Sequence, residues 1–451
     1  MVDEESRGLI RAMGRWTLTA LVINSIIGSG IFGLPSVVAG YLGKQSPLAY
    51  LVAAAGIGVV IACFAEVASQ FGAAGGPYLY AREAFGRFIG LEVGWLLLLV
   101  RLTAAAAAAN LFTDYLAEFW PAVQQPIARL SVLAILIGFL AAANYRGVKS
   151  GAAVSNIFTV AKLAPLFAFA AAGMFLVLRA HPEISAGTSI RAPAPIRNWL
   201  EAALVLMFAY GGFEGAVVPM AEARDPRRNV PFALYLALAT TTALFCVIQY
   251  VVVRILPAAA QTDRPLAEAA RLLWGSAGAG LISIGALISV YGYLSAQMLH
   301  VPRLTFALAE RGDFPRIFAR IHRRFRTPDI SILIFAVIVL GLAQAGNFKW
   351  NVLLSSVGRL FVYGSTCASL PVLRRKRPDA QAHRLVAGNG FAALGILFVA
   401  ALASRMNRDE ALIILATMAI AFANWLWTRR KRLDALSSPT NLDDWKSSPK
   451  M

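Results

Sequence analysis

Long apolar stretches alternate with short polar connections along almost the whole chain. About twelve of these stretches reach or approach the roughly 20 residues that an α-helix needs to cross a bilayer. They lie near residues 17–40, 48–72, 88–115, 130–145, 152–178, 199–221, 231–256, 276–306, 329–346, 350–371, 388–405 and 409–428. The pattern predicts an all-α polytopic membrane protein. Its single transmembrane domain would occupy residues 17–428, between an N-terminal segment (1–16) and a polar tail (429–451).

Two of the predicted spans are interrupted by glycines. Gly28-Ser29-Gly30 lies in the middle of the first span, and Gly211-Gly212 lies in the sixth; we call them the first break and the second break. Glycine weakens a helix, and unwound backbone at membrane depth is tolerated only where it is buried in protein or lines a cavity. Small residues also let membrane helices pack closely. The matching places of the two motifs in two halves of the chain favour broken helices around a substrate site.

Composition narrows the class of protein. Of the 451 residues 58% are hydrophobic and 15% are charged, which is typical of a polytopic membrane protein. The net charge of +18 raises the idea of nucleic-acid binding, but the spans leave no room for a soluble basic domain. The three cysteines fall in apolar segments, and the four histidines show no metal-ligand spacing. No disulfide framework, metal, cofactor or enzymatic activity is expected.

The positions of the basic residues predict the orientation. With the N-terminus inside and the loops alternating, about 28 of the 42 lysines and arginines fall on the inner side. This bias predicts a multi-pass protein of the plasma or inner membrane with both termini cytoplasmic. We expect no removable signal peptide. The basic run 429–432 is interpreted as a positive-inside stop rather than as a lipid-binding site.

Four motifs stand in order along the chain. They are Ile26-Ile27-Gly28-Ser29-Gly30-Ile31-Phe32, the stretch Glu66–Gly86 with Gly75-Gly76-Pro77-Tyr78, the stretch Phe208–Phe213 followed by Ala221–Pro231, and Pro302–Pro315. Together they resemble the first, second, sixth and eighth helices of amino acid–polyamine–organocation (APC) transporters, with similarity to the L-type and cationic amino acid branches. The resemblance covers residues 15 to 330 with good motifs and continues more weakly to 428.

The resemblance implies a fold and a site. The fold would be two inverted five-helix repeats, near 17–178 and 199–371, plus two extra helices at 388–428. The substrate would be an amino acid, with its carboxylate on first-break amides and its ammonium on carbonyls near both breaks. The residues expected to bind it are Ile26, Gly28, Ser29, Gly30, Phe208, Gly211 and Gly212. Phe208 would be an aromatic gate; ordinary packing is its alternative role.

Two charged residues are candidates for coupling and gating. Lys162 lies about 12 Å into the fifth span at 1.5 Å per residue, where an amine must pair or snorkel to the interface. The resemblance implies that the amine takes the place of a sodium ion. Glu214 follows the second break and is either a gate or a polar tie between helices, with Arg101 and Arg359 as candidate partners. We expect Glu66 to be a structural tie to basic loops.

The sequence therefore predicts a secondary transporter that moves amino acids by alternating access, independently of sodium. It leaves proton symport and exchange open. The small residues at the breaks favour a neutral or moderately large side chain. The alternatives are a cationic amino acid or polyamine antiporter and a transport-dead membrane sensor. Lipid and the small-molecule substrate, with protons in the case of symport, are the expected partners; nucleic acid is not expected, and no partner protein can be named.

Overall fold

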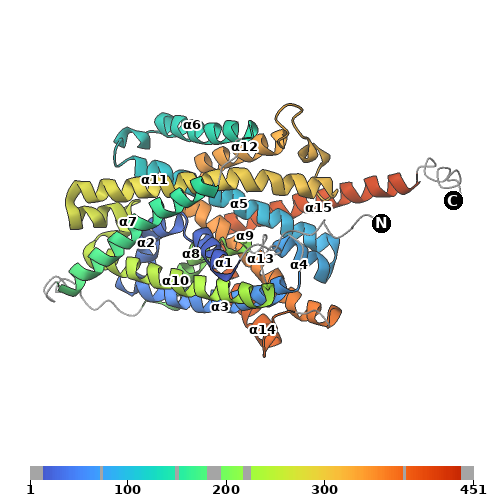
Figure 1. The fold of residues 1–451 in the computed structure, drawn as a ribbon, viewed down its shortest axis with the longest axis horizontal. Coiled ribbons are helices and arrows are strands. Elements are labelled where there is room, and N and C mark those ends of the chain that lie inside the picture. The colour runs from blue at the N-terminus through green and yellow to red at the C-terminus, as the bar shows by residue number, and fades with distance from the viewer. Residues whose placement is uncertain are drawn as a thin grey trace.

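The computed structural model describes residues 14–71, 75–147, 152–179, 194–216, 225–378 and 382–437. These residues form a bundle of α-helices, many of which run along the long axis of the molecule (Figure 1), and they contain no strand. In chain order the helices are α1 (Arg15–Ile26), α2 (Gly30–Leu42), α3 (Ser46–Ser69), α4 (Gly76–Phe85), α5 (Arg87–Leu116), α6 (Pro126–Tyr145), α7 (Ala152–Arg179), α8 (Ile196–Ala209), α9 (Phe213–Ala216), α10 (Pro226–Ile255), α11 (Pro265–Glu310), α12 (Asp329–Ala345), α13 (Phe348–Lys376), α14 (Gly388–Ala403) and α15 (Arg408–Ser437). Short 3-10 turns at 43–45, 121–124, 259–261 and 316–319 join some of them.

Every predicted span coincides with a helix, or with a helix pair where a break was predicted. The first span is divided into α1 and α2. The sixth is divided into α8 and α9, and its end at 217–221 lies outside the described residues. Within the described ranges, six stretches are long and apolar enough to cross a membrane, and three shorter apolar helices accompany them. The predicted all-α membrane fold with broken first and sixth helices is confirmed.

The longest helix, α11, is bent near its start. Trp274 and Gly275 leave the helical conformation, with φ of +68° at the glycine. The predicted span begins just after this bend, so the first turns of α11 precede it. At the other end α11 continues past the span to Glu310.

Helix α5 lies at the centre of the bundle. It packs against α13, α11, α12 and α15. The run of alanines at 104–109 is completely buried, and such small side chains let neighbouring membrane helices approach closely. By contrast, α6 exposes Ile127, Ile135 and Phe139, as expected for a helix that faces lipid.

Polar ties fasten one end of the bundle, where α4 lies (Figure 1). Glu66 on α3 accepts two hydrogen bonds of 2.6 Å from the Arg374 guanidinium, and it also accepts one from the amide of Leu385. The expected structural role of Glu66 therefore matches its contacts.

A second tie at this end surrounds Asp313, just beyond α11. Its carboxylate pairs with Arg82 at 3.0 Å and with Arg87 at 2.6 Å, and it accepts a hydrogen bond from Tyr78. Its backbone carbonyl accepts a hydrogen bond of 2.7 Å from Asn424 on α15. Burial, together with the bond to Asp313, raises the pKa of Tyr78 to about 12. These contacts join α4, α5, α11 and α15.

Candidate functional site

The first break leaves backbone amides without partners. Helix α1 ends at Ile26 and α2 begins at Gly30. The amides of Phe32 and Gly33 turn back to the Ser29 carbonyl, at 3.2 and 3.3 Å. Across the described ranges, the amides of Gly28, Ser29 and Gly30 donate to no backbone carbonyl, and the Ser29 side chain forms no cap. These amides stand at the N-terminus of α2, where the helix carries a partial positive charge.

The second break lies directly against the first. Gly212 has φ of +111°, a conformation that side chains rarely adopt, and a Cβ there would overlap the Ser25 carbonyl of α1. A Cβ on Gly30 would lie 3.2 Å from the Cα of Ala209 and 3.4 Å from the Phe208 ring. The glycines therefore let two interrupted helices meet backbone to backbone.

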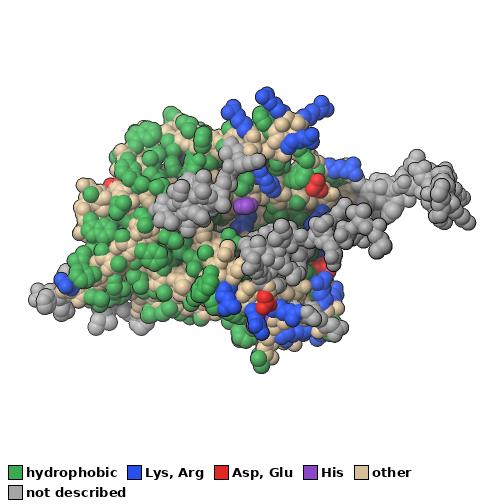
Figure 2. Space-filling model, in the orientation of Figure 1, with side chains coloured by type: hydrophobic (Ala, Val, Ile, Leu, Met, Phe, Trp, Pro, Cys, Tyr) green, Lys and Arg blue, Asp and Glu red, His purple; other side chains and the backbone are tan. Residues whose placement is uncertain are grey.

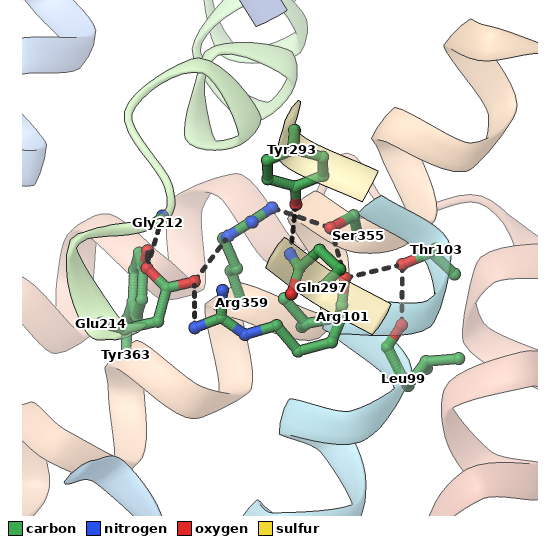
Figure 3. A network of polar contacts seen from close by, with 11 residues as sticks. Leu99, Arg101, Thr103, Gly212, Glu214, Tyr293, Gln297, Ser355, Arg359 and Tyr363 are labelled. Atoms are coloured by element: carbon green, nitrogen blue, oxygen red, sulfur yellow. Dashed lines mark hydrogen bonds and ion pairs between the residues drawn. The ribbon is translucent and has the colours of Figure 1, made fainter. Parts of the chain in front are cut away.

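A buried ion cluster stabilises the second break (Figure 3). The Glu214 carboxylate accepts hydrogen bonds from the Gly212 amide at 2.7 Å and from the Tyr363 hydroxyl at 2.9 Å. It also pairs with Arg359 at 3.4 Å and with Arg101 at 3.6 Å. We call Glu214, Tyr363, Arg101 and Arg359 the central cluster. These contacts join α9 to α5 and α13, as the polar-tie role of Glu214 requires, and a gating role for Glu214 stays a prediction.

The central cluster carries more positive than negative charge. Two guanidiniums face one carboxylate, and the Arg359 side chain is only 3% exposed. Arg359 also donates to the Ser355 hydroxyl at 2.8 Å and stands 5.3 Å from the centre of the Phe208 ring. In the described part of the chain, the Arg101 guanidinium has Glu214 as its ion-pair partner and donates no hydrogen bond.

Two glycines make room for these guanidiniums. A Cβ on Gly211 would overlap the Arg359 guanidinium, and one on Gly215 would lie 2.7 Å from Arg101. Sequence reasoning treated Gly211 as a substrate ligand and did not notice Gly215. The prediction that Arg101 and Arg359 are candidate partners of Glu214 agrees with both ion pairs. The signal for the room that the glycines make is the Gly-Gly-Phe-Glu-Gly run at 211–215.

Helix α11 adds polar groups beside the first break. A Cβ on Gly28 would lie 3.7 Å from the Tyr293 ring, and Gln297 donates to the Tyr293 hydroxyl at 2.6 Å. Figure 3 shows Tyr293 and Gln297 beside Arg359 and Arg101. Polar side chains of α11 therefore lie beside both the first break and the central cluster.

Phe208 lies inside the protein. It is 7% exposed and packs edge to face on Phe348, with ring centres 6.3 Å apart. With Gly30 on one side and Arg359 on another, it touches both breaks and does not face lipid. Ile26 and Ser29, at 4% and 2% exposed, are equally buried.

Lys162 belongs to α7, but its side chain lies outside the described residues. Three residues further along, Pro165 contacts Gly285 of α11, so this part of α7 packs against α11. In the part of the chain that the structure describes, no group of three or more His, Cys, Asp or Glu residues could hold a metal ion.

Comparisons with known proteins place the chain among transporters. A family model described as amino acid permease matches residues 13–423. The chain is 30% identical to the serine/threonine exchanger SteT of Bacillus subtilis (strain 168), over 76% of this chain and 78% of the relative. It is 26% identical to the methylthioribose transporter of the same organism, over 84% of this chain and 85% of that protein. It is 27% identical to cationic amino acid transporter 4 of Mus musculus, over 85% of this chain and 62% of the mouse protein.

Proposed function

The chain belongs to the amino acid permease family, and on that premise we propose that it exchanges amino acids across the membrane by alternating access. The observation that carries the proposal is the pairing of two buried helix breaks, one of which has amides without backbone partners. Discontinuous helices of this kind hold substrates near the bilayer midplane in secondary transporters.

The chemistry of the first break supports an α-amino acid head group. The amides of Gly28, Ser29 and Gly30 suit a carboxylate, because they add hydrogen bonds to the positive end of α2. The carbonyls at the ends of α1 and α8, near Ile26 and Phe208, suit the ammonium. An α-amino acid presents both groups at the spacing of one carbon atom.

The central cluster argues for a substrate without a cationic side chain. Glu214 is already paired with two guanidiniums, so its carboxylate is not available to a lysine, arginine or polyamine. A further cation at the second break would meet net positive charge in a region of low dielectric. This charge balance supports a neutral side chain over the cationic alternative, although one relative is named a cationic amino acid transporter.

Exchange is proposed because the relative SteT is named an exchanger. We propose that Lys162 supplies a fixed positive charge in place of sodium, so that transport needs no sodium. Proton symport is the competing mechanism, in which Lys162 would release its proton during the cycle.

Uptake into proteoliposomes tests the proposal. We expect labelled serine, threonine or a larger neutral amino acid to enter only vesicles preloaded with amino acid, equally well in sodium and in choline. Accumulation in empty vesicles under an imposed proton gradient would replace exchange with symport. Uptake of labelled lysine or putrescine, without uptake of labelled serine, would favour the cationic alternative.

Uptake of labelled methylthioribose alone would move the substrate to a thiosugar, which lacks both head groups. Binding without uptake would favour the sensor.

A further inference from the structure

The connection between α11 and α12 is an exposed basic segment. Residues 316–326 have no acidic residue among them, and Asp313 and Asp329 are the acidic residues that flank them. The segment carries five exposed arginines: Arg316, Arg320, Arg323, Arg324 and Arg326. Figure 2 shows Lys and Arg side chains gathered towards the end of the molecule where this connection lies in Figure 1, whereas hydrophobic side chains cover the opposite part of the same face. We call residues 316–326 the arginine loop.

Internal bonds hold the arginine loop in one conformation. The His322 Nδ1 accepts hydrogen bonds from the amides of Arg324 and Phe325, at 3.3 and 3.2 Å. The His322 ring stacks on Phe325 with centres 5.0 Å apart. Just after the loop, the Thr327 hydroxyl donates to the Tyr145 carbonyl of α6 at 2.8 Å. The loop therefore presents its side chains from a fixed backbone.

One arginine of the loop is held in a strained conformation. Arg326 has φ of +57°, in the left-handed region that L-residues with a Cβ seldom occupy. Its amide donates to the His322 carbonyl at 3.0 Å. Glycine would occupy this position with less strain, and strain of this kind often marks a function.

Most of the charge of the loop is not neutralised by protein. Arg320 pairs with Asp329 at 3.4 Å, and Arg324 stands over the Phe325 ring at 5.5 Å. In the described ranges, the guanidiniums of Arg316, Arg323 and Arg326 have no acidic partner. The arginine loop therefore presents positive charge that no acidic side chain of the described residues balances.

Apolar side chains stand between the arginines. Ile317 is 54% exposed and Ile321 is 45% exposed, although both lie outside the spanning part of the chain. Because α11 and α12 contain consecutive predicted spans, the loop that joins them follows the membrane-spanning part of α11 and lies on the side where the chain turns back. We therefore place it at the boundary between membrane and water. A surface that combines fixed guanidiniums with exposed isoleucines fits the headgroup layer of a bilayer.

We propose that the arginine loop is a binding surface for anionic phospholipids, with guanidiniums on the phosphates and the two isoleucines in the interfacial layer. Each basic residue near an anionic membrane surface contributes about a fivefold preference for anionic lipid. This inference does not depend on which substrate the protein transports.

The test measures which lipids the whole protein retains. The purified chain in neutral detergent is equilibrated with mixed micelles of equal phosphatidylglycerol and phosphatidylcholine. It is then re-isolated, and both lipids are quantified by mass spectrometry. The loop variant is Arg316→Gln/Arg323→Gln/Arg326→Gly. The matched control is Arg254→Gln/Arg375→Gln/Arg408→Gln, which removes the same charge from exposed arginines elsewhere.

We expect the wild type and the control to enrich phosphatidylglycerol. The loop variant, which lacks three guanidiniums, should lose more than the roughly fivefold preference that one of them contributes. Arg326→Gly alone removes one charge and relieves backbone strain. A smaller loss of phosphatidylglycerol preference in this variant would show the effect of the charge without a folding defect. Ile317→Ser/Ile321→Ser should reduce total lipid retained without changing charge. An equal loss in the control would overturn the proposal, because the effect would then be general charge. Displacement of the lipid by inorganic phosphate would also overturn it, because the loop would then bind a soluble anion.

Discussion

The two breaks differ in what stabilises them. The first is bare backbone: Ser29 and Gly30 are buried and Gly28 is half-buried. In the described ranges no charged side chain pairs there, and three amides have no backbone partner. The second is tied by side chains, because Glu214 joins the Gly212 amide to Tyr363, Arg359 and Arg101. Polar groups left without partners are costly in a membrane, whereas paired ones hold helices together.

This difference assigns separate roles to the two breaks. A break whose amides are unused is suited to recognise a ligand. A break whose charges are already paired is suited to fix the positions of α9, α5 and α13. Changes at the second break should therefore affect folding first, and changes at the first break should affect transport first.

The largest effect is expected from Glu214→Ala. The substitution leaves two buried guanidiniums without a carboxylate, and breaking a buried pair costs about 3–5 kcal/mol. We expect a strong fall in the melting temperature and in the yield of monodisperse protein. Glu201→Ala is the control, because it breaks an exposed i,i+4 pair with Arg197 and should cost about 0.5 kcal/mol or less. Equal melting temperatures for the two variants would contradict the structural role of Glu214.

The next effect is loss of transport in Ser29→Leu. Ser29 is 2% exposed between the breaks, so a leucine would occupy the space assigned to the carboxylate. Uptake should fall to background while membrane insertion and melting temperature stay close to wild type. Ser131→Leu on the exposed face of α6 should transport normally. Substantial uptake by the Ser29 variant would remove the first break as the substrate site.

Lys162→Ala should affect the rate rather than the fold. If the amine replaces a sodium ion, the variant should exchange amino acids much more slowly, and Lys162→Arg should restore part of the rate by keeping a charge. The measurement is the initial rate of exchange from pH 5.5 to 8.5. A rate and pH profile identical to wild type would mean that the amine only snorkels to the interface.

Tyr363→Phe sharpens the comparison within the central cluster. It removes one of the three hydrogen bonds to Glu214 and keeps both guanidiniums, so about 1.5–3 kcal/mol of stability should be lost. The variant should bind substrate with unchanged affinity in a radioligand assay. A large loss of affinity with an unchanged melting temperature would make Tyr363 a substrate ligand instead.

The smallest effect concerns the tie at Asp313, away from both breaks. The pKa of Tyr78 is raised to about 12, above its ordinary value near 10. The protonated hydroxyl is therefore favoured in the folded state, and its contribution is complete below pH 10 and is lost as pH rises through 12. The melting temperature of the wild type should fall more between about pH 10 and 12 than that of Tyr78→Phe. Parallel curves would show that the bond to Asp313 does not stabilise the folded state.

The helices and the breaks could be predicted from the sequence because both depend on residues that are close together in the chain. A run of twenty apolar residues or a pair of glycines can be recognised without knowing which helices pack against it. The ion cluster is different. The two arginines inside predicted spans mark candidate partners for Glu214, but Glu214 and Arg359 are 145 residues apart, and whether they pair depends on how α9 and α13 pack. The same holds for Gly215, whose clearance for Arg101 shows only in three dimensions. The roles given to Ile26, Gly28, Ser29, Gly30, Phe208, Gly211, Gly212 and Lys162 stay predictions.

Ligand-induced thermal stabilisation tests the division between the two breaks most directly. The melting temperatures of wild type, Ser29→Leu and Tyr363→Phe are measured with and without saturating amino acid substrate. The account predicts stabilisation by substrate in the wild type and in Tyr363→Phe, even though the latter starts lower. It predicts none in Ser29→Leu, which starts at the wild-type temperature. Stabilisation in Ser29→Leu, with none in Tyr363→Phe, would place recognition at the second break and contradict the account.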